Sequence, residues 1–216
     1  FPNDGPTHHG IQDIYLMYLI PEMEIYNIAD NNLANVVSKK INQIKGPAYI
    51  RLDKGIQNYN QNIDYNLHDG FNLILNNKNK KNLIISSGYF CNLAVEEAKL
   101  TSKVSVINLF KLKKFNEKKL IREVNKYKKI IIYDESTISG GISPILISLF
   151  NKYDIRIKVQ ILASPDIQLF KYSLERLDIL KHLKQTLFFI AKTLVAAPNS
   201  ELRTSTSKPE KLIKPV

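Results

Sequence analysis

Residues 3–13, NDGPTHHGIQD, combine two carboxylates, two histidines and a threonine in one short polar stretch. The Gly5-Pro6 pair favours a turn, and the stretch ends directly before an apolar pattern with helical spacing. Asp4 and His8 are therefore expected on a loop that leads into a helix N-terminus. In open α/β sheets such loops bind ligands, because the free N–H groups of the helix attract anionic and hydroxylated groups.

The same residues also have a purely structural interpretation. Asp4 can cap a turn, His8 can be a half-buried histidine with its hydrogen bonds satisfied, and His9 can be solvated. Composition alone favours this interpretation by about three to one. A metal site at His8 and His9 is disfavoured, because the sequence places no third ligand nearby.

The composition is that of a globular protein, with 216 residues, 44% hydrophobic and 24% charged. This length suits one large domain or two small ones. No apolar run reaches about 18 residues, and residues 186–197 carry Lys192, so we expect no transmembrane helix and no membrane partner. The opening stretch lacks the pattern of a signal peptide. The single cysteine, Cys91, excludes an internal disulfide and favours a cytoplasmic location.

The formal net charge of +11 raises the question of nucleic-acid binding. The lysines are scattered or form short runs such as residues 78–81 and 111–114, and no aromatic side chains alternate with them to form a stacking surface. We therefore give nucleic-acid binding a weight of about one in ten and expect no nucleic-acid partner.

Residues 1–55 predict a helix–strand–helix–strand succession. Pro21 ends the first helix, Asp30 is the expected N-cap of the second, and the Gly46-Pro47 pair stops it. This succession is too short to cover both faces of a parallel sheet, so we interpret it as the rear part of an α/β domain that lacks its preceding strands. The expected helices are 11–19 and 33–44, and the expected strands are 23–28 and 48–52.

Residues 56–81 are polar and are interpreted as a linker, with one strand at 71–75 that can join the next sheet. From residue 82, strands alternate with helices, which predicts an α/β fold with a mostly parallel sheet and right-handed crossovers. A terminal helix is expected near 167–184, and residues 173–216 contain its end, followed by a tail that is expected to be disordered. The expected strands are 82–86, 103–109, 129–134 and 155–162, and the expected helices lie near 92–100, 117–127 and 142–150.

The segments DGPTHHGIQDIYLMYLIPEMEIYNIAD (4–30) and GPAYIRLDKG (46–55) resemble the transketolase family, in which an Asp-Gly-Pro-Thr-His stretch leads a helix and a Gly-Pro-x-x-x-Arg strand follows. Residues 82–100, 104–118 and 130–142 are similar to the C-terminal domain of that family. The resemblance covers about residues 1–172 and is nearest to the C-terminal subunit of split bacterial transketolases.

The resemblance implies four regions. They are the rear part of the pyrimidine-binding domain, truncated at its N-terminus (1–55), a linker (56–81), the transketolase C-terminal domain (82–172), and a terminal helix with a tail (173–216).

The resemblance also implies a thiamine diphosphate enzyme that transfers a two-carbon ketol unit between sugar phosphates. By match to the motif, Asp4 would bind a substrate hydroxyl. His8 would act at the catalytic position, with an imidazole that both donates and accepts. Arg51 would bind the phosphate of the sugar, for which a guanidinium fork is suited. A solvated charge at the sheet edge is an equally good interpretation of Arg51.

The parts that would hold the cofactor are not in this sequence. The family uses a Gly-Asp-Gly motif with a downstream Asn, whereas residues 68–70 read HDG and the asparagines at 76–77 follow too closely. The glutamate that activates the cofactor belongs upstream of Phe1. Residues 134–141, DESTISGG, replace the usual Glu-Glu-His, so any role tied to that histidine is lost.

Thiamine diphosphate and Mg²⁺ (or Ca²⁺) are therefore expected to be bound mainly by other polypeptide. The expected partner is an N-terminal diphosphate-binding subunit or domain, in a homo- or hetero-oligomer, and the chain alone is expected to be inactive.

Three alternatives stay open. Deoxyxylulose-phosphate synthase shares the Gly-x-Thr-His loop, and the beta subunit of 2-oxoacid dehydrogenases shares the architecture, although Pro6 and the run THHGIQD (7–13) favour transketolase. A non-catalytic subunit-docking module would also lack the upstream motifs.

Gly140 and Gly141 could bind an anion before a helix, but helix entry and close packing explain them about four times more readily.

Overall fold

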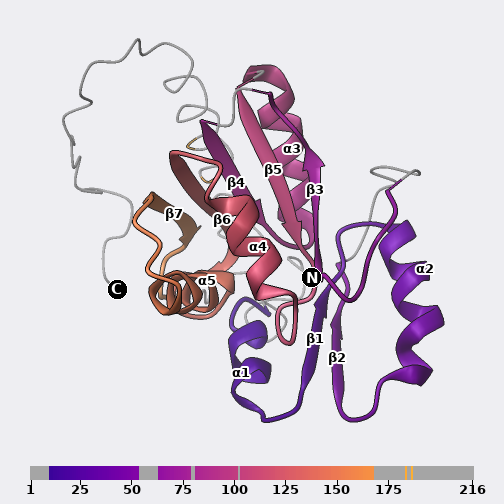
Figure 1. Cartoon of the computed structure of the whole chain (residues 1–216). Coiled ribbons are helices and arrows are strands. Elements are labelled where there is room, and N and C mark those ends of the chain that lie inside the picture. The colour runs from indigo at the N-terminus through magenta and orange to yellow at the C-terminus, as the bar shows by residue number, and fades with distance from the viewer. Residues whose placement is uncertain are drawn as a thin grey trace, which may run out of the picture.

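The computed structural model describes residues 10–53, 63–78, 81–101, 103–167, 183 and 186. The chain forms a small parallel pair of strands and a larger five-stranded sheet (Figure 1). In chain order the elements are α1 (Asp13–Leu19), β1 (Glu24–Asn27), α2 (Asn31–Lys40), a 3₁₀ turn (Ile41–Gln43), β2 (Ala48–Arg51), β3 (Phe71–Leu75), β4 (Asn82–Ser86), α3 (Tyr89–Thr101), β5 (Val104–Leu109), α4 (Glu117–Val124), β6 (Lys129–Thr137), α5 (Ile142–Lys152) and β7 (Lys158–Ser164).

The N-terminal unit, residues 10–53, is built on the parallel pair β1 and β2, whose register places Asn27 beside Arg51. Helix α2 connects the two strands. Its N-cap is Asp30, as the sequence predicts, and the Asp30 side chain accepts a hydrogen bond from Leu33 N at 2.7 Å. The helix ends at Lys40, and the 3₁₀ turn replaces the last turn expected from the periodicity.

The five-stranded sheet has the order β3-β5-β4-β6-β7. Strand β3 is antiparallel to β5 and the other pairs are parallel, which confirms a mostly parallel α/β sheet and the joining of residues 71–75 to it. Side chains alternate between the faces, so Leu83 and Ile85 of β4 pack toward α4 and α5, whereas Ile84 packs toward α3. Figure 1 shows α3 on one side of the sheet and α4 and α5 on the other.

The two units share their hydrophobic cores. Tyr26, Leu33 and Val37 of the N-terminal unit pack with Phe110, which follows β5, and with Tyr65 from the connecting stretch. Side chains of the N-terminal unit also enter the core of the larger sheet, since Ile14 and Ile25 belong to the main core beside α4 and α5. The N-terminal unit is therefore completed by side chains from outside it. The domain boundaries expected at residues 55, 81 and 172 stay a prediction.

Several element ends differ from the expectations. Strand β6 continues to Thr137, three residues beyond the expected end, because Thr137 pairs with Ser164 of β7. Helix α3 begins at Tyr89, earlier than expected, directly after a turn at Gly88 with a φ of 59°. The expected helix near 167–184 and the tail lie outside the described residues, apart from Leu183, which is buried, and Thr186.

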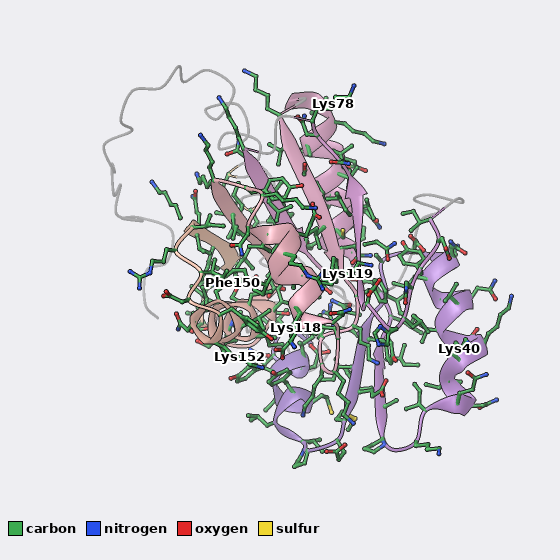
Figure 2. All side chains as sticks on the ribbon, viewed as in Figure 1. Lys40, Lys78, Lys118, Lys119, Phe150 and Lys152 are labelled. Carbon is green, nitrogen blue, oxygen red and sulfur yellow. The ribbon has the colours of Figure 1, made fainter. Side chains whose placement is uncertain are left out.

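Basic side chains are distributed over separate elements. Figure 2 shows Lys40 on α2, Lys78 after β3 and Lys152 on α5, far apart on the surface. Among the described residues, no helix is long and apolar enough to cross a bilayer.

Replacing Asp30 tests how α2 is attached to the rest of the chain. Asp30 caps α2 and also accepts a hydrogen bond from the hydroxyl of Tyr65, which is 5% exposed. Asp30→Ala removes the cap and leaves a buried hydroxyl without its acceptor, so unfolding by urea is expected to show a loss of about 2 kcal/mol. The control is Asn116→Ala, which removes the cap of α4 at a more exposed place and should cost about 1 kcal/mol. Equal losses would contradict a role for the Tyr65 contact.

Candidate functional site

Asp4 and His8, the residues expected to contact substrate, lie outside the described residues. The structure shows the segment that continues from them. The backbone of Ile11 accepts a hydrogen bond from Thr137 N at 3.0 Å, and Tyr15 N donates to the carbonyl of Gly140 at 3.1 Å. The residues that follow the polar loop are therefore attached directly to the end of β6 and to the turn before α5.

Helix α1 does not offer a free N-terminus. It has seven residues, its N-cap Gln12 makes no side-chain capping bond, and one of its early N–H groups is used by the Gly140 carbonyl. Its first-turn carboxylate, Asp13, accepts a hydrogen bond from Tyr49 Oη at 2.6 Å. Burial, followed by the bond to Asp13, raises the pKa of Tyr49 to about 12, so this hydroxyl stays a donor.

Arg51, the expected phosphate ligand, is the last residue of β2 and its side chain is only 13% exposed. Its Nε lies 3.1 Å from Asp13 Oδ2, and its Nη2 donates to the carbonyl of Gly10 at 2.9 Å. Both Nη1 and Nη2 lie 3.4 Å from Glu135 Oε2. The guanidinium therefore joins the N-terminal unit to β6, and the interpretation as a solvated edge charge is wrong. Its binding of a phosphate stays a prediction.

Asp134, Gly140 and Gly141 pack closely together at the turn before α5. Asp134 Oδ2 accepts from Ile142 N at 2.6 Å, and its Oδ1 accepts from Ser136 N at 3.1 Å. Complete burial raises the pKa of Asp134, and the two backbone N–H groups and the Arg51 charge oppose that rise. Because a carboxylate already occupies the N-terminus of α5, Gly140 and Gly141 serve close packing rather than anion binding.

The carboxyl end of β4, where α/β sheets commonly bind ligands, is covered by the N-terminal unit. A Cβ at Gly88 would lie 2.5 Å from Asn27 Oδ1, so the two units touch closely there. Asn27 N donates to Phe110 O at 2.9 Å, and Asn92 Nδ2 donates to Ala29 O at 2.8 Å. The first unit therefore covers the carboxyl end of this central strand.

Two surface hollows lie outside this interface. One, of about 360 Å³, borders α1 and the turn before α5, and includes Gln12, Tyr15 and Asp166. The other, of about 380 Å³, lies at the start of α4 and is lined by Lys111, Lys114, Lys118, His68, Phe115, Asn116 and Glu117. Most of its charges are paired within the chain, as in Lys111 with Glu24 and Lys114 with Glu22.

The described residues do not fit a thiamine diphosphate site. They contain no group of three or more histidine, cysteine or carboxylate side chains that could hold a metal ion. Each oxygen of the buried Asp134 carboxylate accepts a hydrogen bond from a backbone N–H group. The turn at residues 68–70 places Asp69 beside Asn116 and Lys119.

Sequence reasoning missed the partners of Arg51. Asp13 lies in the polar stretch 3–13 and Glu135 in residues 134–141, but Glu135 lies 84 positions from Arg51. The contact could have been predicted only from the rule that buried charges are paired, if both Glu135 and Arg51 had been expected to be buried.

Comparisons with known proteins agree with this fold. The family model described as "Transketolase, C-terminal domain" matches residues 73–184. The 1-deoxy-D-xylulose-5-phosphate synthase of Halothermothrix orenii is 30% identical over 175 residues, covering 76% of this chain and 27% of the relative. An enzyme of the same name from Thermus thermophilus is 26% identical over 164 residues, covering 76% and 26%. The chain thus spans about a quarter of the length of these relatives.

Two solved structures share the fold. One, described as "Split gene transketolase, inactive beta4 tetramer", has a TM-score of 0.72 at 19% identity and covers 89% of this chain and 64% of that chain. The transketolase of Campylobacter jejuni has a TM-score of 0.66 at 17% identity, covering 90% and 29%. With a family model that matches more than half of its residues, the chain belongs to the transketolase C-terminal domain family.

Proposed function

We propose that this chain is the C-terminal part of a thiamine diphosphate-dependent enzyme of the 1-deoxy-D-xylulose-5-phosphate synthase type. The observation that carries this proposal is the extent of the match to relatives of that name. A match over 76% of the chain extends well beyond residues 73–184, the part that the family model covers. Transketolase remains the second candidate, because Pro6 and residues 7–13 favour it.

The two candidates differ in the two-carbon unit that is transferred. A 1-deoxy product ends in a methyl ketone, so its two-carbon unit is an acetyl unit, which a three-carbon 2-oxo acid can supply when its carboxyl group leaves as CO₂. A transketolase transfers a ketol unit taken from a ketose phosphate. In both cases the acceptor is an aldehyde that carries a phosphate.

The proposed roles within this chain fall on the polar loop. Asp4 accepts a hydrogen bond from a substrate hydroxyl, and His8 holds the neighbouring hydroxyl or carbonyl oxygen, since a neutral imidazole has one donor and one acceptor. The motif would make Arg51 a phosphate ligand, whereas its observed neighbours are the carboxylates of Asp13 and Glu135. Because the described residues do not fit the cofactor, no step through it is assigned to them.

The cofactor and its metal ion would be held by an N-terminal diphosphate-binding subunit or domain in a homo- or hetero-oligomer. The split-gene transketolase supports this arrangement, since the structure is that of an inactive tetramer of its beta subunits. A cytoplasmic location is proposed from the single, buried cysteine.

Reconstitution tests the proposal. The chain is combined with polypeptide that supplies the Gly-Asp-Gly half and the rest of the pyrimidine-binding domain, together with thiamine diphosphate and Mg²⁺. Turnover of a 2-oxo acid with an aldehyde phosphate is expected. Turnover from a ketose phosphate donor alone would indicate a transketolase instead. Stable binding without turnover from either donor would indicate a docking module.

Substitution of His8 tests the site within that assembly. His8→Ala is expected to lower kcat/KM by about 100-fold, because a positioned proton donor and acceptor is lost at the reacting carbons. His9→Ala is the matched control, since it removes the same side chain from the adjacent position, and it should change kcat/KM by less than about threefold. Parental activity in both variants would show that the loop does not contact substrate.

A further inference from the structure

Arg51 contacts two parts of the chain that are distant from it in sequence, the segment Gly10–Asp13 and Glu135. Its guanidinium contacts Asp13 of α1, the carbonyl of Gly10, and Glu135 of β6. A planar fork with several fixed donors can satisfy these acceptors together, which a lysine ammonium cannot do with the same geometry. Only 13% of the Arg51 side chain and 5% of the Glu135 side chain are exposed, so solvent screens this contact weakly.

The carbonyl of Gly10 is the point at which residues 3–9 join the described chain. Arg51 Nη2 donates to it at 2.9 Å, and Thr137 N donates to the next carbonyl, that of Ile11, at 3.0 Å. Two successive carbonyls are therefore fixed, one by β2 and one by β6.

The charge balance around Arg51 argues against a phosphate grip. Two carboxylates, Asp13 and Glu135, already lie within 3.4 Å of its nitrogens. A phosphate arriving there would meet these two negative charges at short range in a poorly screened place. The arrangement fits a residue that holds the protein's own backbone.

We propose that Glu135 and Arg51 form one positioning unit, in which the larger sheet orients the guanidinium and the guanidinium holds the Gly10 carbonyl, next in sequence to the proposed substrate loop. This rests on the proposed function of that loop. It gives the C-terminal domain a direct task in the reaction site and makes Arg51 a positioning residue that does not touch the substrate phosphate.

The first test uses hydrogen exchange on the chain itself and needs no activity. In Arg51→Lys, the amides of Thr137 and Tyr15, which hold the anchored segment, should exchange at least about tenfold faster, while the Ile131 amide in the central sheet is unchanged. Glu135→Gln, which keeps the size of the side chain, should act in the same direction. Arg156→Lys is the control, because Arg156 is exposed and pairs only locally with Asp154. Parental exchange in both Arg51→Lys and Glu135→Gln would overturn the proposal.

The second test uses the reconstituted assembly and compares an aldehyde phosphate acceptor with its unphosphorylated analogue. A positioning unit predicts that Glu135→Gln and Arg51→Lys lower kcat/KM by about the same factor, of order tenfold, for both acceptors. A loss confined to the phosphorylated acceptor would overturn the proposal in favour of a phosphate grip. If the parental assembly shows no turnover, the proposed function fails, and the exchange experiment still decides the role of Arg51.

Discussion

Phe110→Ala is expected to lower the free energy of unfolding by about 3–5 kcal/mol, the usual cost of removing a buried aromatic ring. Phe110 is fully buried, and its ring lies 5.4 Å from that of Tyr65 in an edge-to-face arrangement. It fills the core formed by Tyr26, Leu33 and Val37. The N-terminal unit should therefore be held less firmly to the larger sheet, and urea unfolding monitored by circular dichroism measures the loss.

The matched control for this prediction is Phe150→Ala. Phe150 lies on α5, is 3% exposed and belongs to the main core, so its removal should cost a similar free energy (Figure 2). The two variants should differ in where amide exchange accelerates. Phe110→Ala should loosen the helix that contains Leu33 and Val37, whereas Phe150→Ala should leave that helix at the parental rate relative to the sheet. The same exchange pattern in both variants would show that the N-terminal unit has a core of its own.

Local structure was predictable because it depends on local chemistry. The run at 82–86 is apolar and ends in serines and a glycine, and β4 has those bounds. Asp30 was predicted to cap α2 because a short acidic side chain can accept from the first N–H groups of a helix, and it does. Leu120, Ile121 and Val124 have helical spacing, and they are the buried residues of α4.

Long-range partners were not predictable in this way. Periodicity shows that a side chain is buried but not against what, so nothing marked Phe110 as part of the core around α2. Polar residues normally indicate a loop, and Ser136 and Thr137 were expected beyond the strand. They lie within β6, since its last residue pairs with Ser164 at the edge of the sheet.

The candidate site was predictable only in its residue types. The resemblance identified the loop at residues 3–13 and the arginine at 51, but the role of an arginine depends on its neighbours in space. Asp13 and Glu135 are those neighbours, and the backbone contact that we propose as the task of Arg51 rests on them. A motif therefore predicted the position of the residue correctly and left its partner undetermined.

Gly141→Ala is expected to lower the free energy of unfolding by about 4 kcal/mol, because the new methyl group has no space and a charge-assisted hydrogen bond is lost with it. A Cβ at this position would lie 2.5 Å from Ser136 Cβ and would overlap Asp134 Oδ2. The Asp134 carboxylate would have to leave Ile142 N, to which it is bonded at 2.6 Å. Because that bond caps α5 against β6, the helix would shift away from the sheet, and urea unfolding reports the loss.

Two further variants show whether the loss has this cause. Gly10→Ala is the control, since a Cβ there meets only Asp13 atoms at 3.8 Å, and its free energy of unfolding should stay within about 1 kcal/mol of the parent. Adding Asp134→Ala to Gly141→Ala removes one of the two overlaps, so the losses of the two substitutions should combine to less than their sum. Strict additivity would mean that the carboxylate does not contact this turn, and the assignment of the two glycines to close packing around Asp134 would then be wrong.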